Sequence, residues 1–260
     1  MAQRASLDKL QAAYDEQWWA IRSWVDTLDA ADLAQPSAVS GWTVRQLVAH
    51  FALVADSLAA AASSGTSERP MSLSEYLSSY ADGAVLIDTR TREAATRPVR
   101  EALDDRAHAV TQTMSALVVA GGDGASVVQA RRGPLRMDDF MLTRLVELTV
   151  HGDDLGRSLP PGPPLTRSAL QLAVRSLTDV AAARAPGQSV ELRVPPFAAV
   201  QCVAGPTHTR GTPPAVVETD ALTWLRLAAG RQTWAEAMAT GQVRASGQRA
   251  DLGGLLPLLR

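Results

Sequence analysis

Apolar residues recur every three or four positions through most of the first 158 residues, which is the period of a helix with one buried face. The predicted helices run from 6 to 31, from 43 onward, from 72 to 96, from 99 to about 120 and from about 137 to 158. Thr43 and Gln46 have the spacing of a capping box at the start of the second helix. The runs SVVQARR and LRM, on either side of a Gly-Pro turn, predict a small hairpin before the fifth helix.

The pattern changes at LPPGPPL, where four prolines and a glycine cannot continue a helix and favour an extended connector. We therefore expect two domains, 1–159 and 165–260. The second begins with a helical segment, TRSALQLAVRSLTDVAAAR, and continues with the strand-like runs QSVELRV, AAVQCVA and PAVVET. Two helical segments, a short strand in GQVRASG and a last helix should follow. Strands and helices without strict alternation predict an α+β domain.

Composition excludes several classes of function. The chain has 25 basic and 27 acidic residues, a formal net charge of -2, and no basic segment interleaved with aromatic residues. This balance argues against a nucleic-acid partner and favours small-molecule substrates. A single cysteine, no signal-like leader and no clean apolar run of about 20 residues predict a cytoplasmic protein without a membrane span. We expect a monomer or small homo-oligomer.

The fifth helix contains RLVELTVHGDDL, in which ionisable side chains recur every three or four residues. On a wheel of about 100° per residue, Arg144, Glu147, His151 and Asp154 fall within roughly 80° of one another. Apolar residues occupy the same or adjoining sectors, so this polar stripe should face the bundle interior. The opposite face, expected to meet water, carries Asp139, Asp153 and Arg157.

A buried carboxylate and imidazole need compensation by a salt bridge, a hydrogen-bond network or a cation. Glu147 and His151 are one turn apart and could bind one ion, and His50, beside the apolar arc of the second helix, is the best third ligand. Two imidazoles and a carboxylate suit Zn²⁺, with the remaining coordination positions open to water or substrate. Asp154 would then orient an imidazole and Arg144 would engage a substrate carboxylate. The alternative is a buried polar network, with an intrahelical ion-pair network for the last two residues.

The segments GWTVRQLVAHFALVADSL and RLVELTVHGDDL resemble the mycothiol-dependent maleylpyruvate isomerase family. The resemblance implies an N-terminal all-α DinB-like four-helix bundle plus a smaller C-terminal α+β domain, with a divalent metal on His50, Glu147 and His151. It also implies mycothiol as a thiol cofactor that the metal activates for isomerisation or S-transfer on a small electrophile. In relatives an arginine of the second domain faces the metal, and Arg231 is its match here, with Arg226 as the alternative.

The tail of the chain, AAGRQTWAEAMATGQVRASGQRADLGGLLPLL, resembles sterol-carrier-like domains, which close an apolar cavity. This resemblance supports a second hypothesis, a protein that binds a small apolar ligand or lipid and has a structural or residual metal site. A third reading is an interaction module without a metal. The sequence does not identify the substrate, and it does not distinguish isomerisation from S-transfer.

Overall fold

The computed structural model describes residues 4–80, 83–205 and 215–259, and its contacts divide the chain into two compact units, Met1–Ala169 and Leu170–Arg260. The first unit contains α1 (Leu7–Asp26), α2 (Ala30–Ala34), α3 (Val44–Ala62), α4 (Leu73–Ser78), α5 (Ala84–Ala94), α6 (Val99–Val119), β1 (Val127–Ala130), β2 (Gly133–Arg136) and α7 (Met137–Ser158). The other elements are α8 (Arg167–Arg184), β3 (Val190–Val194), β4 (Ala198–Cys202), β5 (Ala215–Thr219), α9 (Ala221–Ala228), α10 (Trp234–Ala239), β6 (Val243–Ser246) and the 3-10 helix η2 (Gly253–Leu255).

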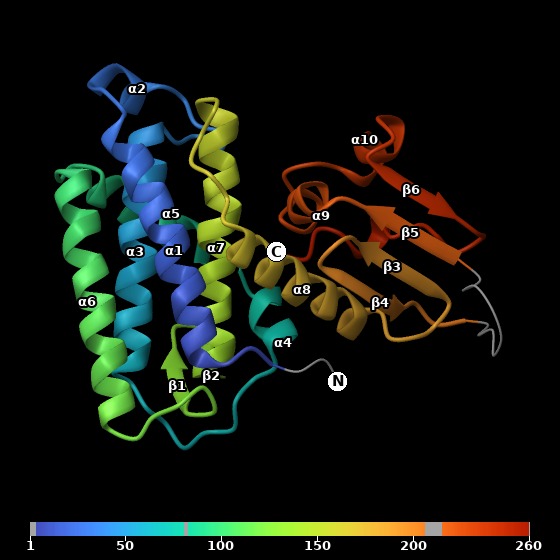
Figure 1. Cartoon of the computed structure of the whole chain (residues 1–260), viewed down its shortest axis with the longest axis horizontal. Coiled ribbons are helices and arrows are strands. Elements are labelled where there is room, and N and C mark those ends of the chain that lie inside the picture. The colour runs from blue at the N-terminus through green and yellow to red at the C-terminus, as the bar shows by residue number, and fades with distance from the viewer. Residues whose placement is uncertain (1–3, 81–82, 206–214, 260) are drawn as a thin grey trace. The chain divides into compact units, whose positions relative to one another are not determined.

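Four long helices, α1, α3, α6 and α7, form the first unit, with the antiparallel β1–β2 hairpin at the opposite end from α2 (Figure 1). Helix α3 packs against both α6 and α7, and α1 packs against α7. The inward face of α3 is buried, with Leu47, Phe51 and Leu58 at 0% exposure. Burial of each such side chain stabilises the fold by about 1.5–3 kcal/mol. The predicted helical bundle is confirmed.

Helix α3 is also long and apolar enough, by length and composition, to cross a membrane. Of its 18-residue apolar window, 61% is buried inside the bundle. The core helices of soluble proteins have these same properties, so the helix by itself is weak evidence for a membrane span.

The second unit is α+β, as predicted. Its mixed sheet has the order β4-β3-β5-β6, in which β3 pairs antiparallel with β4 and parallel with β5, and β5 pairs antiparallel with β6. The burial of β3 and β5 alternates along each strand, with one residue in two fully buried. One face of these central strands therefore supplies the core of this unit.

Three local expectations need correction. The helix expected over 72–96 is two helices, α4 and α5, with Ser79 at the C-cap of α4 and Gly83 at the N-cap of α5. The helix expected over 6–31 ends at Asp26, and α2 follows as a separate element with its own capping box at Asp29. The expectation of a last helix is wrong. The element at this place, η2, is a single 3-10 turn, because its glycines have low helix propensity and Pro257 follows it.

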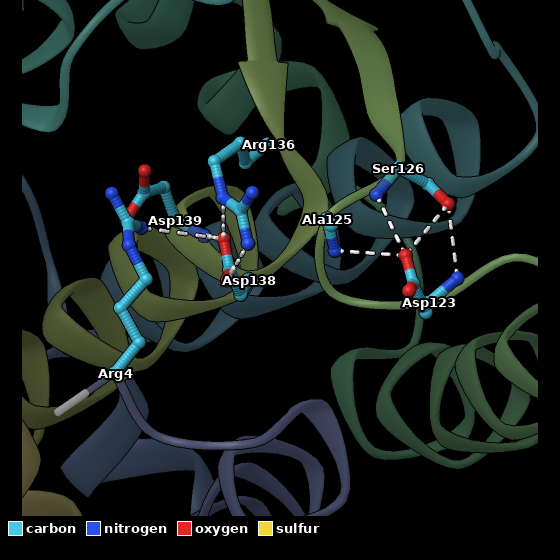
Figure 2. A network of polar contacts seen from close by, with 7 residues as sticks. All are labelled: Arg4, Asp123, Ala125, Ser126, Arg136, Asp138 and Asp139. Atoms are coloured by element: carbon cyan, nitrogen blue, oxygen red, sulfur yellow. Dashed lines mark hydrogen bonds and ion pairs between the residues drawn. The ribbon is translucent and has the colours of Figure 1, made fainter.

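The first turn of α7 is covered rather than open to water (Figure 2). Arg136 forms a forked pair with Asp138, and Arg4 reaches Asp139 from the N-terminal segment. In the preceding loop, Asp123 accepts hydrogen bonds from the backbone of Ala125. The expectation that Asp139 and Asp153 face water is therefore wrong, since both are buried, at 6% and 7% exposure. A wheel drawn on one helix does not include segments that pack on it from elsewhere.

Candidate metal centre

Two imidazoles from different helices meet inside the first unit. His50 of α3 and His151 of α7 lie with ring centroids 5.0 Å apart and an angle of 83° between the ring planes. The indole of Trp42, just before α3, is 5.2 Å from the His50 ring, and Phe51 lies edge-on to His151 at 6.3 Å. The capping box at Thr43 fixes the start of α3, and the helical period then turns His50 inward.

Each of these imidazoles is held through its Nδ1 atom. His50 Nδ1 is 3.2 Å from Thr91 Oγ1 on α5, and His151 Nδ1 is 3.0 Å from Asp154 Oδ2 one turn along α7. Burial lowers the pKa of His50 well below its usual range, and the nearby His151 and Arg144 add to this effect. His50 is therefore a neutral ring whose orientation is fixed, as metal-binding histidines are.

Glu147 lies one turn before His151 on α7 and is paired with Arg144. Its Oε2 atom is 2.6 Å from Nη1 of Arg144, but it accepts no well-aligned hydrogen bond. The side chain of Glu147 is 14% exposed and that of Arg144 only 7%. The ion pair is therefore nearly buried and includes a carboxylate oxygen whose hydrogen-bonding capacity is not used.

The guanidinium of Arg144 is fixed by its surroundings. It donates to Thr143 Oγ1 at 3.1 Å, to Ser57 Oγ at 3.2 Å and to the Tyr80 hydroxyl at 2.9 Å. Its central carbon lies 4.9 Å from the centre of the Phe140 ring. Burial opposes its positive charge, but the carboxylate of Glu147 and the neighbouring tyrosines keep the pKa of Arg144 above its ordinary value.

No three His, Cys, Asp or Glu side chains among the described residues are grouped as a metal-binding set. The donor chemistry nevertheless fits a divalent ion. Two imidazoles on one tetrahedral ion, with bonds of about 2.0–2.1 Å, have ring centres roughly 5 Å apart, as His50 and His151 do. The buried Oε2 of Glu147 accepts no hydrogen bond, and a cation could bind this oxygen in place of the missing donor. The fit requires that Arg144 share or release this carboxylate.

Arg231 belongs to the second unit, where it follows α9. Its backbone N–H donates to Arg226 O at 2.7 Å, and its Nη1 atom donates to Ala229 O at 3.3 Å. Both arginines are partly buried and near the end of α9. The role of Arg231 at the metal, and the alternative role of Arg226, stay predictions.

Sequence reasoning missed the neighbours that hold the predicted side chains. Thr91 at His50, and Ser57 and Tyr80 at Arg144, come from elements whose relative placement no pattern specified. The capping box and the inward stripe of α7 were the only available signals. The single cysteine, Cys202, is fully buried in β4, and burial raises the pKa of its thiol, as expected of a packing residue.

Comparison with known families gives two matches. Residues 14–156 match the mycothiol maleylpyruvate isomerase N-terminal domain, which is more than half of the chain. The chain belongs to this family. Residues 166–258 match the family described as bacterial SCP ortholog. No curated protein matches the sequence.

Two solved structures share the fold. A histidine-to-alanine variant of mycothiol-dependent maleylpyruvate isomerase aligns with a TM-score of 0.56 and 18% identity, over 92% of each chain. Another structure of mycothiol-dependent maleylpyruvate isomerase aligns with a TM-score of 0.54 and 17% identity, over the same shares. This family member has the architecture of the isomerase at a large distance in sequence.

Proposed function

We propose that the chain is a divalent-metal enzyme that uses a small thiol, mycothiol, for isomerisation or S-transfer on a small electrophile. The observation that carries the proposal is the pair of inward imidazoles, with centres 5.0 Å apart, one of which lies one helical turn from Glu147 on α7. His50, Glu147 and His151 would hold the ion, with Zn²⁺ as our first choice. When bound, such an ion favours the thiolate form of a coordinated thiol near neutral pH.

The chain's own residues would do the positioning. Asp154, at 0% exposure, holds His151 through Nδ1 and so keeps Nε2 turned toward the ion. Arg144 is a rigid, permanently charged donor that could bind a substrate carboxylate in place of the carboxylate of Glu147. Arg231 would contribute a second guanidinium. The proposal includes a cytoplasmic protein that acts as a monomer or small homo-oligomer.

The metal site is tested first by elemental analysis after equilibration with limiting Zn²⁺. We expect about one ion per chain in the wild type and almost none in His50→Ala or Glu147→Ala, because three protein ligands are needed. His108→Ala is the matched control, since this exposed imidazole on α6 bonds the carbonyl of Asp104, away from the candidate site. A folded wild type that takes up no ion would contradict the proposal.

The reaction class is tested with the metal-loaded protein, mycothiol and maleylpyruvate, with glutathione in place of mycothiol as the comparison. An isomerase converts the substrate while the free thiol concentration stays constant. An S-transferase consumes one thiol for each product formed. No turnover with either thiol would leave the metal site intact and remove the assignment of mycothiol.

A second function, binding of a small apolar ligand or lipid, is favoured by the match of residues 166–258 to the bacterial SCP ortholog family. A cavity of about 160 Å³ lies in the first unit, between α3, α5 and α6. Mass spectrometry of the purified protein under native conditions would detect a retained lipid. A lipid-loaded protein without metal would favour this second function.

A further inference from the structure

The buried guanidinium of Arg144 occupies the position at which a cation would have to compete for Glu147. Three hydroxyl groups and the Phe140 ring hold this guanidinium in place. It is therefore prevented from swinging out into water. Any cation that binds Glu147 must then approach a carboxylate that already has a fixed positive partner.

We infer that Arg144 and a divalent cation compete for the carboxylate of Glu147, so that the guanidinium is the counter-ion of the metal-free protein and weakens metal binding. This inference rests on the proposed function. It assigns Arg144 a role toward the metal that precedes any contact with substrate. Arg144 is in this respect a positioning residue, acting through Glu147.

Three physical effects favour tighter metal binding once the charge of Arg144 is removed. Two positive charges in a nearly buried site repel each other more strongly than they would in water. Glu147 no longer has to exchange one positive partner for another. In addition, the metal-free variant contains a buried carboxylate without its counter-ion, which the ion then stabilises. Together these effects predict an increase of about tenfold or more in the association constant for Zn²⁺.

The test is calorimetric titration of the full-length, metal-free protein with Zn²⁺. Arg144→Met removes the charge and keeps most of the length, and Arg144→Gln is measured beside it because an amide can still donate to Ser57 or Tyr80. Arg144→Lys retains a positive charge and should bind Zn²⁺ about as the wild type does. Arg22→Met is the matched control, since Arg22 is a nearly buried arginine of α1 paired with Asp104 on α6.

A second readout follows folding instead of binding. Metal-free Arg144→Met should unfold at lower urea concentration than the wild type, and saturating Zn²⁺ should stabilise it by a larger shift of the midpoint. A variant that folds only when Zn²⁺ is added supports the inference as well. If Arg144→Met does not fold under any condition, Arg144→Gln decides the question.

Wherever at least one of these proteins binds Zn²⁺, the titrations test this inference and the proposed function separately. Tighter binding in the Met and Gln variants, but not in Arg144→Lys or Arg22→Met, supports the competition. Unchanged or weaker binding in both neutral variants, with Zn²⁺ bound by the wild type, overturns the inference and leaves the proposed function standing. Zn²⁺ binding only in the neutral variants supports the competition but contradicts the proposed function, because the wild type then holds no ion. No binding in any of these proteins overturns both.

Discussion

Asp154 connects the imidazole of His151 to the rest of helix α7. One carboxylate oxygen accepts from His151 Nδ1, and the other lies 3.3 Å from Nη1 of Arg157. The side chain is fully buried, so it cannot move away into solvent. The direction of the His151 Nε2 atom therefore depends on a residue three positions further along the chain.

Replacing Asp154 with Asn should weaken Zn²⁺ binding by about 10–100-fold, because the amide cannot hold the imidazole as a carboxylate does. Competition with a chromophoric chelator measures this change. Asp104→Asn, which alters a carboxylate paired with Arg22 outside the candidate site, is the control and should leave the affinity unchanged. Equal affinity in the wild type and Asp154→Asn would show that Asp154 does not orient the ligand.

At the scale of single residues, the sequence was informative wherever one helix determined the outcome. Glu147 and His151 are neighbours on any α-helix of this sequence, so their shared face could be predicted. The pair of Arg144 and Glu147, three positions apart on α7, also lies on one helix, whereas the contact of His50 with Thr91 depends on packing between α3 and α5. Such contacts leave no periodic signal in the sequence.

Helix α9 begins after an N-cap residue, Asp220, whose negative charge contributes to the stability of the fold. The Asp220 carboxylate accepts hydrogen bonds from the backbone N–H groups of Leu222 and Thr223 and from the Thr223 hydroxyl. Partial burial on its own would raise the pKa of Asp220, but these hydrogen bonds lower it below the usual value. The folded state therefore binds a proton at this group less readily than the unfolded chain does.

The sign of the pH dependence follows. The stabilisation by Asp220 is complete above the pKa of about 3.9 in the unfolded chain, and it is lost as pH falls through the lower folded value. Asp220→Asn keeps an N-cap residue but cannot titrate. Urea unfolding between neutral and acid pH should show the wild type losing its advantage over Asp220→Asn as the solution becomes acidic. A difference that stays constant with pH would contradict this account.

Elements with strong local signals were predictable and those without were not. The apolar period predicted α3, α6 and α7, and a capping box also marked the start of α3. The β1–β2 hairpin was predicted as well, but its turn lies at Arg131–Arg132, and Gly133 belongs to β2. The division of the 72–96 segment was not apparent, because its apolar period continues through Gly83. The strand order of the sheet in the second unit could not be predicted either, since strand pairing depends on contacts between residues distant in sequence.

At the scale of the whole molecule, the proline-rich connector, residues 159–165, is held against helix α1 of the first unit. A buried side chain of α1 makes this attachment. Gln17 of α1 has 0% exposure, donates to Pro164 O at 3.2 Å and accepts from the backbone N–H of Thr166 at 2.8 Å. Gly156 and Gly162 also approach so closely that a side chain at Gly162 would meet backbone atoms of Gly156. The connector therefore folds back along the bundle up to residue 166.

Gln17→Ala should destabilise the full-length protein by about 1–3 kcal/mol, because it removes two hydrogen bonds between a fully buried amide and the backbone of Pro164 and Thr166, each worth about 0.5–1.5 kcal/mol. Urea unfolding followed by circular dichroism measures the loss. Gln112→Ala, at an exposed position of α6, is the control and should change stability by less than about 0.5 kcal/mol. Equal stability of the two variants would mean that water replaces the connector at Gln17.

The attachment of the connector to α1 also limits how this chain can be recombined with its relatives. A chimaera joined at the first proline would place a foreign connector against Gln17 and offer the buried amide a backbone of different shape. A junction after Thr166 keeps the amide and both of its backbone partners from one parent. In an exchange of domains between family members, the prolines should therefore be inherited together with the helical bundle.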